Sequence, residues 1–400
     1  MEPKRVVWLC HLANEELNQY FGIQRNEIAY WVTQFLDIMK GHNLDIHIVC
    51  PNYYTNLDTQ VKLGEVTYHL YKYYSGWGDD RSSILELALR NCRNICQKIE
   101  EIVDSIHPDV VHLYGAENIT YSAGVLPLME KYPVLVTFQG YIQLTKDFGG
   151  FLKKFTINRR IKIEDTILTK ATHVTFGEIE ETSRKYYLTK YGNKPTLFLN
   201  FPTKLPNIDA SKATKEYDVV FWGRVTSNKG VGDLIRAVSK IKINRANVSC
   251  LILGGGSEVY MNELKNLVEE LQLEDNIIFG GFQKTNEELF VNAAKARVYA
   301  LPTYFDALPG SIRESMSMKL PVVTYPVGDI PYLNTDKQTI LLANYKDIDS
   351  LAANIEKLLA DKELYHTLSE NAFQMMMQQN DNEYIATQMI DCYKECIKSR

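Results

Sequence analysis

Short, mainly apolar runs alternate with longer segments of helical periodicity along most of the chain. Apolar residues recur at intervals of three and four over 84–106, 230–243 and 259–271, which predicts helices there. Short continuous apolar runs are typical of parallel strands covered on both faces. The runs are RVVWLCHL, DIHIVCP, VTYHLYKY, DVVHLYG, VLVTFQG and ATHVTFG, then DVVFWG, SCLILGGG, NIIFGGF, RVYALPT, PVVTYPV and TILLA. This alternation predicts an α/β fold with doubly wound parallel sheets.

The 400 residues are enough for two domains, each with its own core. The stretch NFPTKLPNIDASKATKEYD contains two prolines and has no helical periodicity, and a new strand begins at Asp218. We therefore predict one Rossmann-like domain over residues 1–200 and a second over residues 201–381.

The composition argues against several classes of function. A hydrophobic content of 45% and a charged content of 23% are those of a soluble globular protein, and the net charge of −5 disfavours nucleic acid as a partner. No run of 18 apolar residues occurs, and MEPKRVVWLC shows no secretory signal, so we expect a cytoplasmic protein without a membrane span. The i, i+4 pairs among the seven cysteines suit core thiols better than a zinc site.

The segment FWGRVTSNKGVGDLIRA places two cations after a strand. The strand ends at Gly223, Arg224 follows it, and Lys229 stands where a helix begins at Gly230. Ligands of open parallel sheets bind outside the carboxyl ends of strands. A guanidinium, an ammonium and the N–H groups of a helix start together suit a diphosphate. A surface loop with two solvated cations explains the same residues.

Two glycine-containing strand ends follow. LILGGGSE runs into Gly254, Gly255 and Gly256, where a backbone could approach a ligand closely, although a plain turn from strand to helix fits equally well. The spacing is not the dinucleotide fingerprint. One strand later, FGGFQ repeats the pattern, and its Phe282 is a candidate for lining a base pocket.

The segment DALPGSIRESM offers two interpretations. Ser311 and Glu314 have the spacing of a capping box, which would explain both residues structurally. A substrate site instead explains why Asp306 directly follows a strand and why Pro309 and Gly310 make a turn before the helix. In that interpretation Glu314 accepts hydrogen bonds from ribose hydroxyls and Asp306 accepts them from the transferred sugar.

These motifs, in this order, resemble the nucleotide-sugar domain of retaining glycosyltransferases of family four, which have the GT-B fold of two Rossmann-like domains facing across a cleft. The resemblance is strong over about a hundred residues and includes MSMKLPVVTYPVGDIPYL. It implies that Arg224 and Lys229 bind the donor diphosphate, that Asp306 stands where the family more often has Glu, and that segment 382–400 packs back on the first domain. The implied donor-binding residues are Gly223, Arg224, Lys229, Gly255, Phe282, Asp306, Ala307, Leu308, Pro309, Gly310, Ser311 and Glu314.

The first half matches the family less closely. Instead of the glycine-rich loop after the first strand, the chain has LANEELNQYFGIQRNEIAYW, with Gly22 alone. A histidine common in the family is replaced by Gln139, which can form hydrogen bonds but cannot act as a base at neutral pH. We expect Gln139 to position the donor, with an ordinary glutamine at a strand end as the alternative.

Other polar residues at strand ends are candidates for the acceptor side. His112 and Glu117, with Asn118 beside them, follow one strand, and His11 follows another. For His112 the alternative is a core histidine satisfied by hydrogen bonds.

The segment KDFGGFLKKFTINRRIKIED interleaves six cations with apolar side chains. Such a stretch suits an anionic membrane surface, at about 1 kcal/mol for each cation, or is an ordinary helix with a solvated basic face. The six cations are Lys146, Lys153, Lys154, Arg159, Arg160 and Lys162.

The resemblance implies transfer of a sugar from a nucleotide-diphosphate donor to a hydroxyl of a glycan or lipid-linked acceptor with retention of configuration, in cell-surface polysaccharide biosynthesis. We expect no cofactor and no metal, because two cations can stand in for a metal at the diphosphate. A location on the inner membrane face is a further expectation. The alternatives are a nucleotide-sugar epimerase, a non-catalytic binding module and a nicotinamide dehydrogenase, the last disfavoured by the missing fingerprint.

Overall fold

The computed structural model divides the chain into two compact units. The first comprises residues 1–178, 183–202 and 381–400, and the second comprises residues 179–182 and 203–380. Each unit contains one sheet and its own hydrophobic core. The described residues are 3–23, 25–72, 92–137, 140–142, 151–192, 194–203 and 205–399, without the side chains of 151–156.

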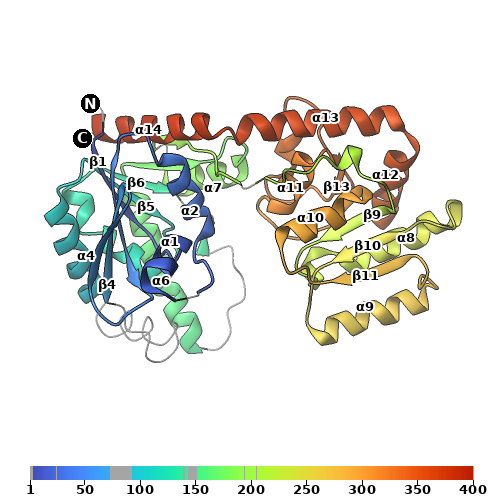
Figure 1. Ribbon diagram of the computed structural model, residues 1–400, viewed down its shortest axis with the longest axis horizontal. Coiled ribbons are helices and arrows are strands. Elements are labelled where there is room, and N and C mark those ends of the chain that lie inside the picture. Colours follow the sequence, from blue (N-terminus) through green and yellow to red (C-terminus); the bar gives the residue numbers. More distant parts are fainter. Residues whose placement is uncertain are drawn as a thin grey trace. The chain divides into compact units, whose positions relative to one another are not determined.

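The first unit contains a sheet whose described strands follow the order β3-β4-β2-β1-β5-β6-β7-β8 (Figure 1). Neighbouring strands are parallel except β3 and β4, which are antiparallel. Val6 and Trp8 of β1 pack in one core cluster and Val7 and Leu9 in another, so both faces of the sheet are buried. The strands are β1 Arg5–Leu9, β2 Asp45–Asn52, β3 Thr59–Leu63, β4 Val66–Lys72, β5 Val110–Tyr114, β6 Val134–Thr137, β7 His173–Phe176 and β8 Thr196–Phe198.

Helices follow most of these strands. They include α14, whose Ile385, Met389 and Tyr393 are buried in the same cluster as Trp8 of β1. The Tyr393 hydroxyl accepts a hydrogen bond from Trp8 Nε1 at 2.9 Å, which joins this helix to the sheet. The α-helices are α1 Glu15–Phe21, α2 Tyr30–Met39, α4 Arg93–Ile106, α5 Ile119–Ser122, α6 Phe151–Lys170, α7 Glu181–Tyr191 and α14 Asn382–Lys398, and the 3-10 turns are η1 Ala123–Val125 and η2 Leu128–Glu130.

The second unit contains an all-parallel sheet in the order β11-β10-β9-β12-β13-β14. Its strands are β9 Tyr217–Trp222, β10 Cys250–Leu253, β11 Ile277–Gly281, β12 Ala296–Leu301, β13 Val322–Thr324 and β14 Leu341–Leu342. Its helices are α8 Val231–Asn244, α9 Glu258–Glu270, α10 Asn286–Ala294, α11 Gly310–Ser317, α12 Ile348–Ala360 and α13 Lys362–Gln379, with 3-10 turns η4 Ala210–Lys212, η5 Ser227–Lys229 and η6 Ile330–Asn334. The predicted α/β class with doubly wound parallel sheets is confirmed.

Within the described ranges, every helix is too short or too polar to cross a lipid bilayer. The seven cysteines are free thiols, and six of them are buried. No group of three or more His, Cys, Asp or Glu side chains that could hold a metal ion occurs among the residues the structure describes.

Candidate functional site

The candidate site is built where β9 and β12 end side by side in the second unit. These strands pair in parallel, so their following loops leave from the same edge of the sheet. The backbone N–H of Tyr304 donates to the carbonyl oxygen of Asn228 at 2.7 Å, and Thr303 Oγ1 donates to the same oxygen at 3.2 Å. Residues far apart in sequence are thereby held in one place.

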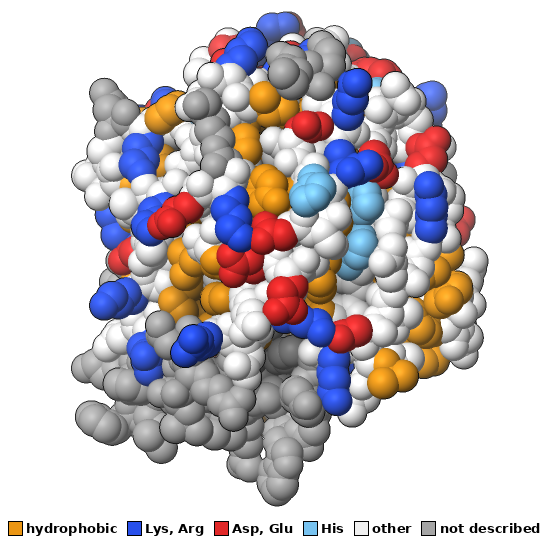
Figure 2. Space-filling model, turned by 90° about the vertical axis from the view of Figure 1, so that its left-hand side faces the viewer, with side chains coloured by type: hydrophobic (Ala, Val, Ile, Leu, Met, Phe, Trp, Pro, Cys, Tyr) orange, Lys and Arg blue, Asp and Glu red, His pale blue; other side chains and the backbone are white. Residues whose placement is uncertain are grey.

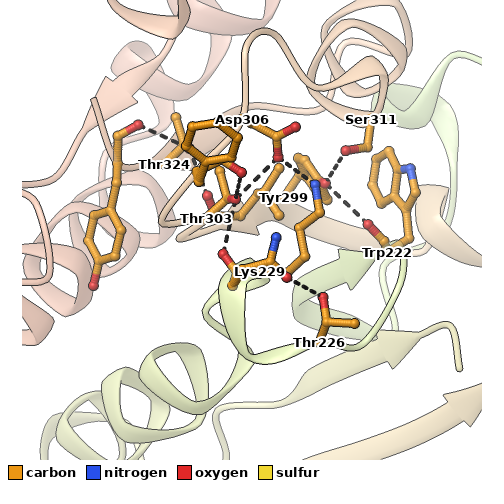
Figure 3. Close-up of polar contacts among 12 residues, drawn as sticks. Trp222, Thr226, Lys229, Tyr299, Thr303, Asp306, Ser311 and Thr324 are labelled. Carbon is orange, nitrogen blue, oxygen red and sulfur yellow. Dashed lines mark hydrogen bonds and ion pairs between the residues drawn. The ribbon is translucent and has the colours of Figure 1, made fainter. Parts of the chain in front are cut away.

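Lys229 and Asp306 face each other across these two loops (Figure 3). Lys229 Nζ forms an ion pair with Asp306 Oδ2, and Thr303 Oγ1 lies 3.2 Å from the same oxygen. The two charged side chains are 18% and 22% exposed, so the pair is only partly screened by water. The structure therefore brings together two residues predicted to bind donor, with each as the other's partner.

Glycines make the close approach of these loops possible. Gly230 has φ 70°, and a Cβ there would lie 1.9 Å from the carbonyl oxygen of Pro302. Gly328 follows β13 with φ 55°, and a Cβ there would lie 2.1 Å from the carbonyl oxygen of Asp306 and 2.3 Å from that of Ala307. The N–H of Asp329 donates to the latter oxygen at 2.8 Å. The loop after β13 thus supports the loop that carries Asp306.

Arg224 follows β9 and is exposed, and among the described residues its guanidinium has no ion-pair partner. The N–H of Val225 donates to the carbonyl oxygen of Gly255 at 2.9 Å, which joins this loop to the one after β10. Gly255 itself is exposed, and a Cβ there would have no neighbour within 4 Å. Phe282, which is 79% exposed, follows β11, and β10 separates that strand from β9.

The predicted capping box does not form. Helix α11 begins at Gly310, so its N-cap is Pro309, which has no side chain to accept a hydrogen bond. Ser311 and Glu314 lie within the helix: Ser311 Oγ accepts from the Tyr299 hydroxyl at 2.7 Å, and Glu314 Oε2 accepts from Trp222 Nε1 at 3.0 Å. The structural explanation for Glu314 therefore fails, because the residue that would complete the box is two positions too late.

The surroundings of Glu314 act on its pKa in opposite directions. Burial raises the pKa of the Glu314 carboxyl, while the hydrogen bond from Trp222 and the charge of Arg313 act to lower it. Of the intervening residues, Ala307 and Gly310 are exposed and Leu308 packs against the core. Nothing in the sequence spacing indicates that Trp222 contacts Glu314, that Thr303 contacts Asp306 or that Tyr299 contacts Ser311.

His112 is not an acceptor-side residue. Its side chain is fully buried in the first unit, with Nδ1 2.9 Å from the Tyr393 hydroxyl and Nε2 2.8 Å from Thr137 Oγ1. Burial holds the pKa of His112 well below its usual value. Both ring nitrogens are engaged inside the core, so the side chain cannot reach a substrate.

Glu117 and its neighbours lie where β5 ends. Glu117 Oε2 is buried and accepts no hydrogen bond from a described residue, and burial raises the pKa of its carboxyl. Asn118 Nδ2 lies 3.0 Å from His11 Nδ1, which joins the ends of β1 and β5. Gln139 lies outside the described residues.

The basic segment corresponds in part to α6. Lys146 lies outside the described residues, as do the side chains of Lys153 and Lys154. Arg160 is not on a solvated face, because it is half-buried and its Nη2 donates to the carbonyl oxygen of Glu117 at 2.9 Å. Lys162 is exposed. On the face of the first unit shown in Figure 2, basic and acidic side chains are interspersed rather than gathered by sign.

Solved structures identify the fold. Sucrose-phosphate synthase from Thermosynechococcus elongatus superposes with a TM-score of 0.69 at 18% identity, covering 99% of this chain and 100% of the other. Anabaena HepE in complex with UDP gives a TM-score of 0.66 at 14% identity, covering 97% and 98%. The fold is therefore GT-B, with two Rossmann-like domains.

Sequence comparisons relate the second unit to a family. Residues 207–375, which lie in that unit, match the model of glycosyl transferases group 1. A glycosyltransferase of Methanocaldococcus jannaschii is 26% identical over 178 residues, which are 44% of each chain, so this match spans less than half of that relative. N-acetyl-alpha-D-glucosaminyl L-malate synthase of Bacillus anthracis is 26% identical over 318 residues, 76% of this chain and 79% of its own.

Proposed function

We propose that the protein is a retaining, metal-independent glycosyltransferase that moves a sugar from a nucleoside diphosphate to a hydroxyl of a glycan or lipid-linked acceptor. The observation that carries the proposal is the ion pair of Lys229 with Asp306 between the loops that follow β9 and β12, with Glu314 bonded to Trp222 at the end of β9. The family match supports it, as does HepE, which was solved with UDP.

Each group has a chemical task in this proposal. Arg224 and Lys229 bind the diphosphate, assisted by N–H groups at the start of α11. Glu314 accepts hydrogen bonds from the ribose, and Asp306 accepts them from the transferred sugar. The residues from 307 to 310 approach the donor through their backbone, because they carry small or inward-packed side chains.

Donor binding exchanges the partner of Lys229. Without donor, Asp306 neutralises its ammonium group. A diphosphate replaces that carboxylate, and the released Asp306 is then free to accept from the sugar. In this way the ion pair couples recognition of phosphate to recognition of sugar.

The chemical step is departure of the nucleoside diphosphate from the anomeric carbon. The bond from that carbon to the phosphate oxygen breaks while the acceptor oxygen bonds on the same face, and the leaving phosphate takes the acceptor proton. Negative charge therefore grows on phosphate, and Arg224 and Lys229 stabilise it. By analogy with oxyanion donors, each such contact contributes about 2.7–4 kcal/mol.

A ligand screen followed by a turnover assay tests this function. The protein is heated with UDP, GDP, ADP, CDP and the corresponding nucleotide sugars, with EDTA present throughout. A ligand at a hundredfold excess over its Kd adds about 2.7 kcal/mol of apparent stability. The nucleotide sugar that stabilises the protein most is then assayed for hydrolysis or transfer in EDTA, which reports turnover and metal independence. NMR of the product anomer reports retention.

Each outcome is decisive for one part of the proposal. No stabilisation by any nucleotide contradicts a donor site, and binding without turnover indicates a binding module. An inverted product contradicts the retaining mechanism.

We further propose that the acceptor is a precursor of a cell-surface polysaccharide reached at the inner membrane face. Relatives named for lipopolysaccharide core and colanic acid biosynthesis support the first part. The exposed Lys162 and the predicted cations other than Arg160, which is half-buried, motivate the second. Binding to phosphatidylglycerol vesicles before and after replacing these five cations by Gln is the test, and equal binding contradicts membrane contact.

A further inference from the structure

Trp222, the last residue of β9, holds the carboxylate of Glu314 in α11. The indole Nε1–H donates to Glu314 Oε2 at 3.0 Å, and Trp222 is only 2% exposed. The two residues are 92 positions apart in sequence and meet because β9 pairs with β12, the strand that precedes α11.

The indole itself is held in place. Its ring lies 3.9 Å from the ring of Tyr299, centroid to centroid, at an interplanar angle of 37°. The hydroxyl of Tyr299 donates to Ser311 Oγ at 2.7 Å and lies 3.3 Å from the backbone carbonyl oxygen of Trp222. These three labelled residues lie together in Figure 3. The donor that reaches Glu314 therefore has a fixed direction.

Stability alone does not explain a carboxylate at this position. A buried indole N–H needs an acceptor, but a backbone carbonyl would serve. A carboxylate must be desolvated to be placed here, and burial raises the pKa of Glu314 as a result. A carboxylate at this position is explained if its second oxygen accepts a hydrogen bond from a bound ligand.

That second oxygen, Oε1, lies beside Gly310. A Cβ at Gly310 would be 4.0 Å from it, so any side chain longer than alanine would begin to cover it. Gly310 has no left-handed φ that would require glycine. The backbone therefore does not require glycine at this position, and the glycine leaves the space beside Oε1 without a side chain.

We propose that Trp222 is the positioning residue that sets selectivity for a ribonucleotide. By binding Oε2 it fixes the carboxylate plane and presents Oε1 to the hydroxyls of the ribose. A carboxylate without this restraint can turn about its last torsion, which has broad minima. A 2′-deoxyribose leaves a buried acceptor short of a donor, which a fixed carboxylate penalises more than a mobile one. This inference rests on the proposed donor site.

The test compares each nucleoside diphosphate with its 2′-deoxy counterpart by calorimetry. UDP, GDP, ADP and CDP are first titrated into the unchanged protein to find the one that binds. The ratio of the two Kd values is then measured in Trp222→Phe, which loses the N–H and keeps an aromatic ring. Trp8→Phe is the matched control, because it makes the same change to a buried indole whose N–H donates to Tyr393 in the first unit.

We expect the unchanged protein and Trp8→Phe to prefer the ribonucleotide by about tenfold or more, and Trp222→Phe by about threefold or less. Gly310→Leu, which covers Oε1 and leaves Trp222 intact, should also lose the preference, and it serves if Trp222→Phe does not fold. An unchanged ratio in Trp222→Phe or Gly310→Leu overturns the inference while the donor site stands. Failure of every diphosphate to bind the unchanged protein overturns the donor site and the inference together.

Discussion

Lys229 Nζ and Asp306 Oδ2 form a partly buried ion pair between the loops that follow β9 and β12. Both residues belong to the predicted donor site, and the ion pair already engages the ammonium group that a diphosphate would need. The strength of donor binding therefore includes the displacement of one carboxylate.

Asp306→Asn should have opposite effects on binding and on transfer. Removing the carboxylate leaves Lys229 free for phosphate, so the nucleoside diphosphate should bind about three- to tenfold more tightly. Transfer should fall about a hundredfold or more, because a strong acceptor for the sugar hydroxyls is lost. Calorimetry with the diphosphate and initial rates measure the two effects. Asp349→Asn, which breaks the exposed ion pair with Lys240, is the control and should change neither.

Arg224→Ala should lower the rate of transfer by about 10²–10³, since it removes one of two cations from the leaving group. The measurement is kcat/KM for the donor that the ligand screen identifies. Arg245→Ala is a suitable comparison, because it removes the same charge at the far end of α8 from the site. Helix α8 begins at the site end of the sheet, and Arg245 is its C-cap. Full turnover in Arg224→Ala would remove this residue from the proposed diphosphate site.

Gly328→Ala should destabilise the second unit and weaken donor binding together. Its φ of 55° disfavours a side chain, and the added Cβ would clash with two backbone oxygens of the loop carrying Asp306. We expect a loss of about 1–3 kcal/mol in unfolding free energy. Gly255→Ala is the matched control: its Cβ would meet nothing, so stability should stay within about 0.5 kcal/mol. Equal melting temperatures for the two variants would contradict this account.

Glu164→Gln should stabilise the protein at high pH only. Glu164 is fully buried on α6, both of its carboxylate oxygens lie near the N–H of Ile142, at 3.2 and 3.3 Å, and burial raises its pKa to about 7. The charge of Glu117 acts in the same direction. Because the folded pKa is raised, the stability this group contributes is complete below its ordinary pKa of 4.5 and is lost as pH rises through about 7.

Glutamine keeps an acceptor for Ile142 and carries no charge. The variant should therefore match the unchanged protein at pH 4.5 and exceed it by up to about 3 kcal/mol at pH 8. Urea unfolding at both pH values measures the difference, and Asp165→Asn, on the same helix and partly exposed, controls for general charge removal. An equal gain at both pH values would show that Glu164 is ionised in the fold.

Most of the fold was predictable because its signal is local. Continuous apolar runs and helical periodicity predicted the alternating elements, and the resemblance implied that segment 382–400, which forms α14, packs on the first domain. The sequence did not predict β3 and β8. β3 has the pattern TQVKL with only two apolar residues and pairs antiparallel at an edge, and β8 has only three residues. Such strands form because a neighbouring strand supplies hydrogen bonds, which short local patterns do not show.

The candidate site was predictable as a set of residues but not as an arrangement. Residue type and spacing made Arg224, Lys229, Asp306 and Glu314 candidates, because strand ends, cations and carboxylates have recognisable chemistry, and the family resemblance supplied their roles. Only the pairing of β9 with β12 decided that Lys229 would face Asp306 and that Trp222 would hold Glu314. The same dependence on packing placed His112 in the core, bonded to Tyr393, which is 281 residues away. Local sequence determines which element a residue joins, whereas burial and hydrogen-bond partners come from elements distant in the chain, and their contacts exist only after the sheet has assembled.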